Sequence, residues 1–332
     1  MAKSIKIILL PLLILAALSL LAIPGCGEKE TPAATTASAA PTTATTAPAT
    51  TPAAPATVTT KTTAATAPGQ PELQQVLTNS VAAMKKVSTY RFVMNMGIKM
   101  DITGGSEAGK MNMTSTIGGD INQTTREMIM VMNMSLNMNT KTAAPVSQNL
   151  SLQMYVLADK LYLNMDMPPL GKQWLKMPFS EQLKEAYNLN AVEQQLAPLE
   201  SVKDLKFLRY ETFDGSDCYV LTVTPDMQKI LSWVGKDLPA ELNTDNLEQI
   251  SKMFKNLSYT LWIARDSGLI KNMDVAMRLE MSPDQFASGK ATDFQNLTMD
   301  VMMTMKMFDH NKPVSIVLPP EAKNALEIPA QK

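Results

Sequence analysis

The stretch MIMVMNMSLNM, residues 128–138, decides the fold, because an apolar side chain occupies every second position. Successive side chains of a β-strand point to opposite faces, so this alternation predicts a strand with one apolar face. The side chains on that face are Met128, Met130, Met132, Met134, Leu136 and Met138. Ile129 and Val131 occupy the opposite face, so the first part of the strand is expected to be buried on both sides. A strand of this kind belongs to a sheet that is covered on one face.

The same alternation recurs on both sides of this stretch. It predicts strands over residues 91–101, 111–117, 150–156, 161–167, 207–212, 219–224, 257–263, 269–281, 297–307 and a short last one over 314–318. Turns are predicted at Gly104-Gly105, Asp159-Lys160, Asp214-Gly215 and Asp266-Ser267-Gly268, and the strand that begins at Met111 is expected to end at Gly118-Gly119. Because these connections are short, neighbouring strands are expected to pair antiparallel.

Helices are predicted before the first strand and in the middle of the folded region. Leu73, Leu77, Val81 and Met84 recur at helical spacing. The middle segments 177–205 and 227–254 are richer in Leu, Glu, Gln, Lys and Ala, and we expect short helices there, with breaks near Pro198 and Pro239. The predicted fold class is α+β, with a large curved antiparallel sheet, or half-barrel, wrapped around a few helices that cover its apolar face. Residues 71–332 are expected to form this one domain.

The first residues have the organisation of an export signal. Lys3 and Lys6 precede an apolar run over residues 7–22, which suits the hydrophobic region of a signal peptide. The run ends in Ile23-Pro24-Gly25-Cys26, which resembles the bacterial lipobox. The resemblance implies removal of residues 1–25 and diacylation of the Cys26 sulfur, and two acyl chains give stable membrane attachment. The alternatives are an ordinary cleaved signal peptide or an uncleaved anchor helix, with Cys26 incidental.

Residues 26–70 are predicted to be a linker between the membrane and the folded domain. Thr31 to Pro68 is almost entirely Ala, Thr and Pro, with no periodic apolar pattern. Such a segment buries too little apolar surface to offset the entropy of ordering and is expected to be disordered. As a flexible coil of about 40 residues it would span roughly 35 Å. The expected location is the extracytoplasmic face of the cell membrane.

The composition argues against several classes of function. A formal net charge of −1 gives no electrostatic reason to expect a nucleic-acid partner. With 2 Cys, one of them in the lipobox, and 1 His, no internal disulfide is expected, and neither is a cofactor, a metal site or a catalytic triad. Cys218 reads as a small buried residue, since no neighbouring His could activate it. His310 reads as a solvated turn residue. The chain is therefore predicted not to be an enzyme.

Three short patterns resemble the LolA-like superfamily, and more closely its half-barrel lipoproteins of the LppX/LprG group. They are the opening helix running into Ser88-Thr89-Tyr90-Arg91-Phe92, the segment 261–269 with sequence LWIARDSGL, and Asn311-Lys312-Pro313-Val314-Ser315-Ile316 running into Leu318-Pro319. The resemblance implies a half-barrel that encloses a hydrophobic cavity for acyl chains, with no catalytic signature.

The 26 Met residues, against 8 Phe and 3 Trp, are the most unusual feature of the chain. Unbranched thioether side chains repack around variable ligands, so the Met stripes could line an adaptable apolar pocket. The candidate lining residues are Met94, Met96, Met128, Met130, Met132, Met134, Met154, Met165, Met273, Met277, Met303 and Met305. The alternative is an ordinary core filled with Met. A Cu(I) site is disfavoured, because alternate residues of a strand lie about 6.5–7 Å apart.

Together these features predict a membrane-anchored extracytoplasmic lipoprotein that binds a lipid or another hydrophobic ligand in an apolar cavity. An open cavity on the order of several hundred Å³ between the sheet and its helices would fit this function. The alternative is a non-enzymatic cell-surface structural or sensory lipoprotein, with a filled core, that binds an envelope protein. The expected partners are the membrane, through Cys26, and a hydrophobic molecule or an envelope protein.

Overall fold

A computed structural model of the chain describes residues 69–106, 108–167, 171–179, 199, 202–234, 251–282 and 294–328. The predicted signal peptide, Cys26 and the linker up to Pro68 lie outside these residues, and so do the helix breaks predicted near Pro198 and Pro239. Those predictions stay predictions.

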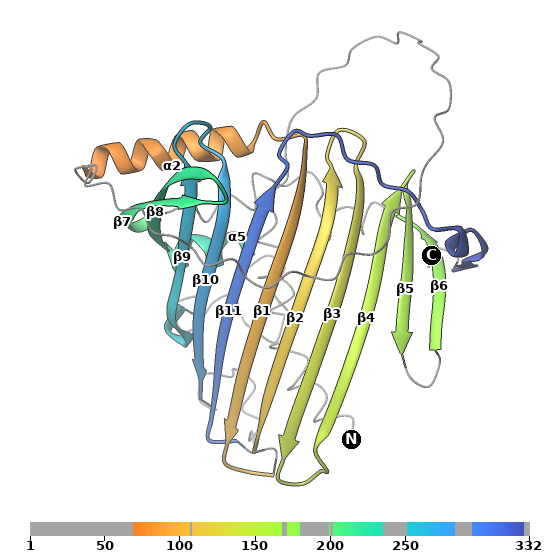
Figure 1. The fold of residues 1–332 in the computed structure, drawn as a ribbon. Helices are drawn as coiled ribbons and strands as arrows, with labels where there is room; N and C mark the ends of the chain where they lie inside the picture. The colour runs from red at the N-terminus through yellow and green to blue at the C-terminus, as the bar shows by residue number, and fades with distance from the viewer. Residues whose placement is uncertain are drawn as a thin grey trace, which may run out of the picture.

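Twelve strands form a single sheet, in the order β12-β6-β5-β4-β3-β2-β1-β11-β10-β9-β8-β7, and Figure 1 shows the sheet curving across the molecule. The strands are β1 (Thr89–Thr103), β2 (Gly109–Asn122), β3 (Glu127–Thr140), β4 (Val146–Leu157), β5 (Lys160–Met167), β6 (Gly171–Pro178), β7 (Val202–Phe213), β8 (Ser216–Pro225), β9 (Phe254–Ala264), β10 (Ile270–Met281), β11 (Asn296–Phe308) and β12 (Leu326–Glu327). Every pair is antiparallel except β12 with β6. Apart from β12, the sheet has two halves, β1 to β6 and β7 to β11, in which strands that are consecutive in the chain pair with each other. The pairing of β1 with β11 joins these halves.

Few helices accompany the sheet in the described part of the chain. They are α2 (Gln70–Met84), α5 (Met227–Val234) and the 3₁₀-helix η3 (Pro320–Asn324). Leu77 and Met84 of α2 and Ile230 of α5 belong to the same hydrophobic core as the strands. Figure 1 shows α2 lying across one end of the sheet, while α5 lies behind the sheet in this view. The large curved antiparallel sheet predicted from the sequence is thus confirmed, while the α+β label fits only loosely, since the described elements are mostly strands.

The three sequence patterns that carried the resemblance assemble where α2 meets the sheet. Asn311 Oδ1 accepts a hydrogen bond from the Ser88 backbone N–H at 2.8 Å, and the Thr89 hydroxyl donates to the Lys312 carbonyl at 2.7 Å. The backbone N–H of Ile270 donates to the Met84 sulfur at 3.4 Å. These contacts fix the end of the opening helix and the start of β1 against β10 and the segment that follows β11.

The predicted end of the strand at Gly118-Gly119 is wrong, because β2 continues through both glycines to Asn122. Gly119 pairs with Phe92 on one side and Met130 on the other. A Cβ atom at Gly119 would lie 2.3 Å from the Ile129 carbonyl oxygen and 2.9 Å from Cε1 of the Phe92 ring. The glycine therefore makes room for a neighbouring ring within the sheet, a role that glycine commonly plays inside strands.

The middle of the chain contains more strand than the composition predicted. Residues 171–178 form β6, which was not predicted, and β7 begins at Val202, inside the segment expected to be helical. The predicted pair of strands around Asp214-Gly215 is confirmed as β7 and β8. The helix α5 confirms a helix after Thr224, and the other predicted middle helices lie outside the described residues.

The predicted last strand over residues 314–318 is also wrong, because this segment has no regular structure. Pro313 and Pro319 flank it, and proline has no N–H to give to a sheet ladder. The chain instead runs on to β12, which pairs with β6. There the Ile328 N–H donates to the Lys176 carbonyl at 2.8 Å, and Lys176 Nζ lies 3.0 Å from Glu327 Oε2. The C-terminal segment thus protects the edge of the sheet that β6 would otherwise expose.

Candidate functional site

One face of the sheet, which we call the inner face, carries the alternating apolar side chains of all the long strands. Neighbouring strands place these side chains in rows across the sheet. In one row Met94 pairs with Met305 of β11 and with Ile117 of β2, and Ile117 pairs with Met132 of β3. All of the methionines predicted to line a pocket lie on this face: Met94, Met96, Met128, Met130, Met132, Met134, Met154, Met165, Met273, Met277, Met303 and Met305.

Part of the inner face is fully covered. The buried predicted residues are Met94, Met128, Met154, Met273, Met277, Met303 and Met305, none of them more than 6% exposed. They lie mostly on β1, β10 and β11, where α2 and α5 contribute to the same core. In this region the methionines pack as an ordinary core does.

The remaining predicted methionines, Met96, Met130, Met132, Met134 and Met165, are only partly buried. All but Met96 lie on β3 and β5, where the inner face is incompletely covered. The apolar side chains that share this state on neighbouring strands are Leu136 of β3, Leu150 and Leu152 of β4, Leu163 of β5, and Leu175 and Met177 of β6. We call these residues, with Met130, Met132, Met134 and Met165, the half-open strip.

The half-open strip is apolar along its length and across its width. Met134 pairs with Leu150, Met132 pairs with Leu152, and Leu152 pairs with Met165, so the side chains continue from strand to strand. Each of its members is Met or Leu, which leaves it without a charged side chain of its own. Sequence reasoning missed its leucines, because only methionines were selected, and missed Leu175 because β6 was not predicted.

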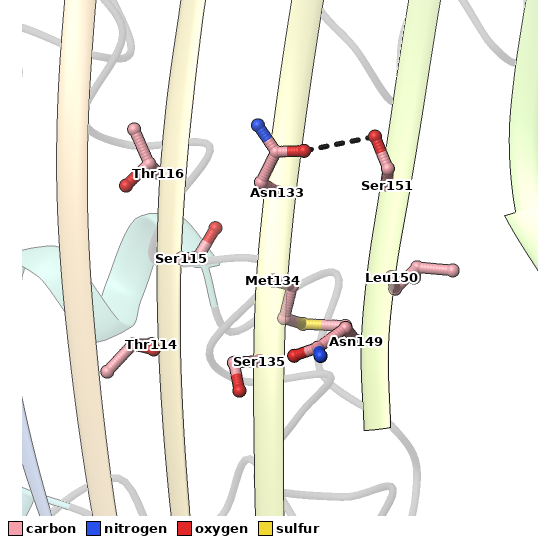
Figure 2. Close-up of a pocket in the computed structure, with 9 residues that line it drawn as sticks. All are labelled: Thr114, Ser115, Thr116, Asn133, Met134, Ser135, Asn149, Leu150 and Ser151. Carbon is pink, nitrogen blue, oxygen red and sulfur yellow. Dashed lines mark hydrogen bonds between the residues drawn. The ribbon is translucent and has the colours of Figure 1, made fainter. Parts of the chain in front are cut away.

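A pocket of about 400 Å³ lies among β2, β3 and β4. Figure 2 shows its lining residues, which are Thr114, Ser115, Thr116, Asn133, Met134, Ser135, Asn149, Leu150 and Ser151. Most of them occupy the alternate positions that face away from the methionines. The Ser151 hydroxyl donates to Asn133 Oδ1 at 3.0 Å, and Thr116 donates to Asn95 Oδ1 at the same distance. This pocket is a polar hollow of the outer face, whereas the sequence predicted an apolar cavity on the inner face.

The two side chains singled out as chemically reactive types are both shielded from solvent. Cys218 is fully buried, its thiol donates to the Ser216 carbonyl at 3.4 Å, and burial raises its pKa to about 11. The prediction of a small buried residue is confirmed. His310 lies in the predicted turn, but its ring nitrogens are buried, so a solvated histidine is wrong. Burial lowers the pKa of His310 to about 4, which keeps the ring neutral near pH 7.

Two further properties concern only the described residues. They contain no group of three or more His, Cys, Asp or Glu side chains that could hold a metal ion. None of their helices combines the length and the apolar character that crossing a membrane requires.

The chain matches a known family and resembles several solved structures. A family model described as "Family of unknown function (DUF6612)" matches residues 72–327. No curated protein matches the chain in sequence. The chain is similar to the crystal structure of the Mycobacterium tuberculosis lipoprotein LppX, at 13% identity and a TM-score of 0.38, over 75% of this chain and 100% of that one.

Two more solved structures are similar at low identity. LprF from Mycobacterium bovis is 14% identical with a TM-score of 0.39, over 75% of this chain and 98% of LprF. A DUF1329 family protein from Desulfovibrio piger is 9% identical with a TM-score of 0.20, over 74% of this chain and 94% of that one. Among these structures is LppX, a lipoprotein of the group that the three sequence patterns resemble.

Proposed function

We propose that this chain, which belongs to the DUF6612 family, is a lipoprotein that holds the hydrocarbon part of a lipid or a similar hydrophobic molecule against the half-open strip. The proposal rests on a difference in solvent exposure between the methionines of one continuous apolar face. Met94 and Met305 are almost fully buried, whereas Met132 in the same row and Met134 in the next row keep part of their surface in contact with solvent. A hydrocarbon chain laid on the strip would complete a cover that the described residues supply only over the other half.

The free energy available from such a cover is sufficient for binding. Each buried CH₂ group contributes about 0.8 kcal/mol, so ten of them contribute on the order of 8 kcal/mol before the entropic costs of association are subtracted. Thioether side chains adapt to chains of different shape, which suits the methionines of β3. No bond is made or broken in this function, and the described residues of the strip supply no acid, base or nucleophile.

The proposed setting is the extracytoplasmic face of a membrane, to which the lipidated Cys26 attaches the domain through the Ala/Thr/Pro-rich linker. Substitution Cys26→Ala is expected to move the protein from the membrane fraction to the soluble fraction, because its two anchoring acyl chains are lost. Cell fractionation followed by immunoblotting measures this directly. Unchanged sedimentation of the variant with membranes would contradict lipidation at Cys26.

A second function is favoured by the covered half of the inner face. Met273, Met303 and Met305 are packed as a core, and a protein whose inner face were filled throughout would serve as a surface structural or sensory lipoprotein that binds an envelope protein. If the first function is correct, the purified protein binds a free hydrophobic molecule, and if the second is correct, it does not.

The discriminating experiment is a binding titration of the full chain carrying Cys26→Ala with an environment-sensitive hydrophobic fluorophore. We expect saturable fluorescence enhancement, and displacement by fatty acids that strengthens by up to about fourfold per added CH₂ group. The matched control is the same titration with the unfolded protein in urea. If the fluorophore is not enhanced, or if long-chain and short-chain fatty acids displace it equally, the carrier function is wrong and the second function stands.

A further inference from the structure

A single hydroxyl group interrupts the apolar inner face beside the half-open strip. Ser115 of β2 occupies an inner-face position between Met113 and Ile117 along its strand. Across the sheet it pairs with Met96 of β1 and with Met134 of β3. Its neighbours on this face are therefore all apolar.

The hydroxyl of Ser115 is buried without a hydrogen-bond partner. The residue is 4% exposed, and its Oγ has no partner in the part of the chain that the structure describes. A buried hydroxyl without a partner is unfavourable compared with a methyl group of the same size, and native proteins satisfy most such groups. Gln148, by contrast, pairs with Leu136 on the same face but is exposed, so water can satisfy its amide.

Ser115 is the direct neighbour of a residue on which the proposed ligand would lie, Met134 of the half-open strip. Its row runs from Met303, which is 6% exposed, through Met96 to Met134 and Leu150 of the half-open strip. The hydroxyl thus lies beside the boundary between the covered core and the strip. A ligand on the strip would lie against Met134, the neighbour of Ser115, and the Ser115 hydroxyl can donate one hydrogen bond and accept others.

We propose that Ser115 is a specificity-determining residue, whose hydroxyl donates a hydrogen bond to an oxygen atom of the bound molecule. The ligand class is then an acyl chain that carries an ester carbonyl, and not a plain hydrocarbon. This inference rests on the proposed function and adds the polar part of the ligand to it. A site built to pair a polar group discriminates strongly against an analogue that lacks it, because the partner in the protein is then left unsatisfied.

The test compares two competitors of equal chain length, a fatty acid methyl ester and the corresponding alkane, in displacing the fluorophore from the full chain with Cys26→Ala. We expect the ester to compete about tenfold better than the alkane. The Ser115→Ala variant should lose this preference while its affinity for the alkane stays the same or rises. Ser115→Thr, which keeps the hydroxyl, should retain the preference.

The matched control is Ser80→Ala. Ser80 lies on α2, is fully buried and also has a hydroxyl without a partner in the described part of the chain, but it is not on the inner face of the sheet. Its substitution should leave the ester preference unchanged. Equal competition by ester and alkane in the parent protein, or an unchanged preference in Ser115→Ala, would overturn the role of Ser115 alone. If neither competitor displaces the fluorophore, the proposed function fails first and this inference falls with it.

Discussion

Substitution Gly119→Ala is expected to destabilise the protein by at least about 3 kcal/mol. A Cβ atom at this position would lie 2.3 Å from the Ile129 carbonyl oxygen and 2.9 Å from the Phe92 ring. The ring could turn aside, but the carbonyl belongs to the backbone of β3, so the added atom forces β2 and β3 apart in the centre of the sheet. Equilibrium unfolding in urea, followed by circular dichroism, measures the loss.

The neighbouring glycine provides the control. A Cβ atom at Gly118 would meet nothing closer than 3.7 Å, the distance to the Phe92 carbonyl oxygen. Gly118→Ala should therefore change the stability by no more than about 0.5–1 kcal/mol, and it can increase stability because glycine weakens a strand interior. If both variants unfolded at the same urea concentration, the register that pairs β2 with β1 and β3 at these glycines would be incorrect.

Substitution Met132→Asp is expected to weaken the binding of a hydrophobic ligand by about 100-fold or more. Met132 lies on β3, the strand of the half-open strip that borders the covered core, and is paired with Ile117 and Leu152. A carboxylate there must lose its hydration when a hydrocarbon chain covers it, and the short side chain of aspartate does not reach around the ligand to water. Titration of the variant with the same hydrophobic fluorophore measures the change in affinity.

The matched control for this prediction is the next residue of the same strand. Asn133 points to the opposite, outer face and is exposed, so Asn133→Asp adds the same charge outside the strip. This variant should bind the fluorophore as the parent protein does. Urea unfolding of both variants checks that they remain folded. Equal affinities of a folded Met132→Asp and of Asn133→Asp would place the ligand elsewhere.

Much of the sheet could be predicted because its strands are long and bury one face only. The alternation over residues 128–138 corresponds to β3, and the same rule located β1, β10 and β11. The pairing of β1 with β11 brings together residues that are far apart in the chain, and no local pattern specifies such a contact. The order of strands in the sheet was therefore beyond sequence reasoning.

The errors have local physical causes. Val314, Ile316 and Leu318 alternate like a strand, and each is partly buried, yet the segment lies between two prolines and does not join the sheet. The glycine pair 118–119 resembles the end of a strand in the sequence, although Gly119 lies within β2 and makes room for the Phe92 ring. The edge strand β6 was missed because its first residues, at positions 171–173, are exposed and give no alternation.

The candidate site was predictable only in part. The alternation placed Met132 and Met305 on the same face, and the register agrees with that placement. The sequence contains no signal that Met305 is completely buried and Met132 is not, because this difference depends on which strands of the sheet are covered by other parts of the protein. The importance of Ser115 also emerges only once its apolar neighbours are known.

Native mass spectrometry of the full chain carrying Cys26→Ala, purified without detergent, tests the central claim most directly. If a hydrocarbon chain completes the cover of the half-open strip, the folded protein should carry an added mass in the range of an acyl-containing lipid, and the Met132→Asp variant should lose it. A folded parent protein that is found only at its own mass, and that stays so after incubation with membrane lipids, would contradict lipid binding on the strip.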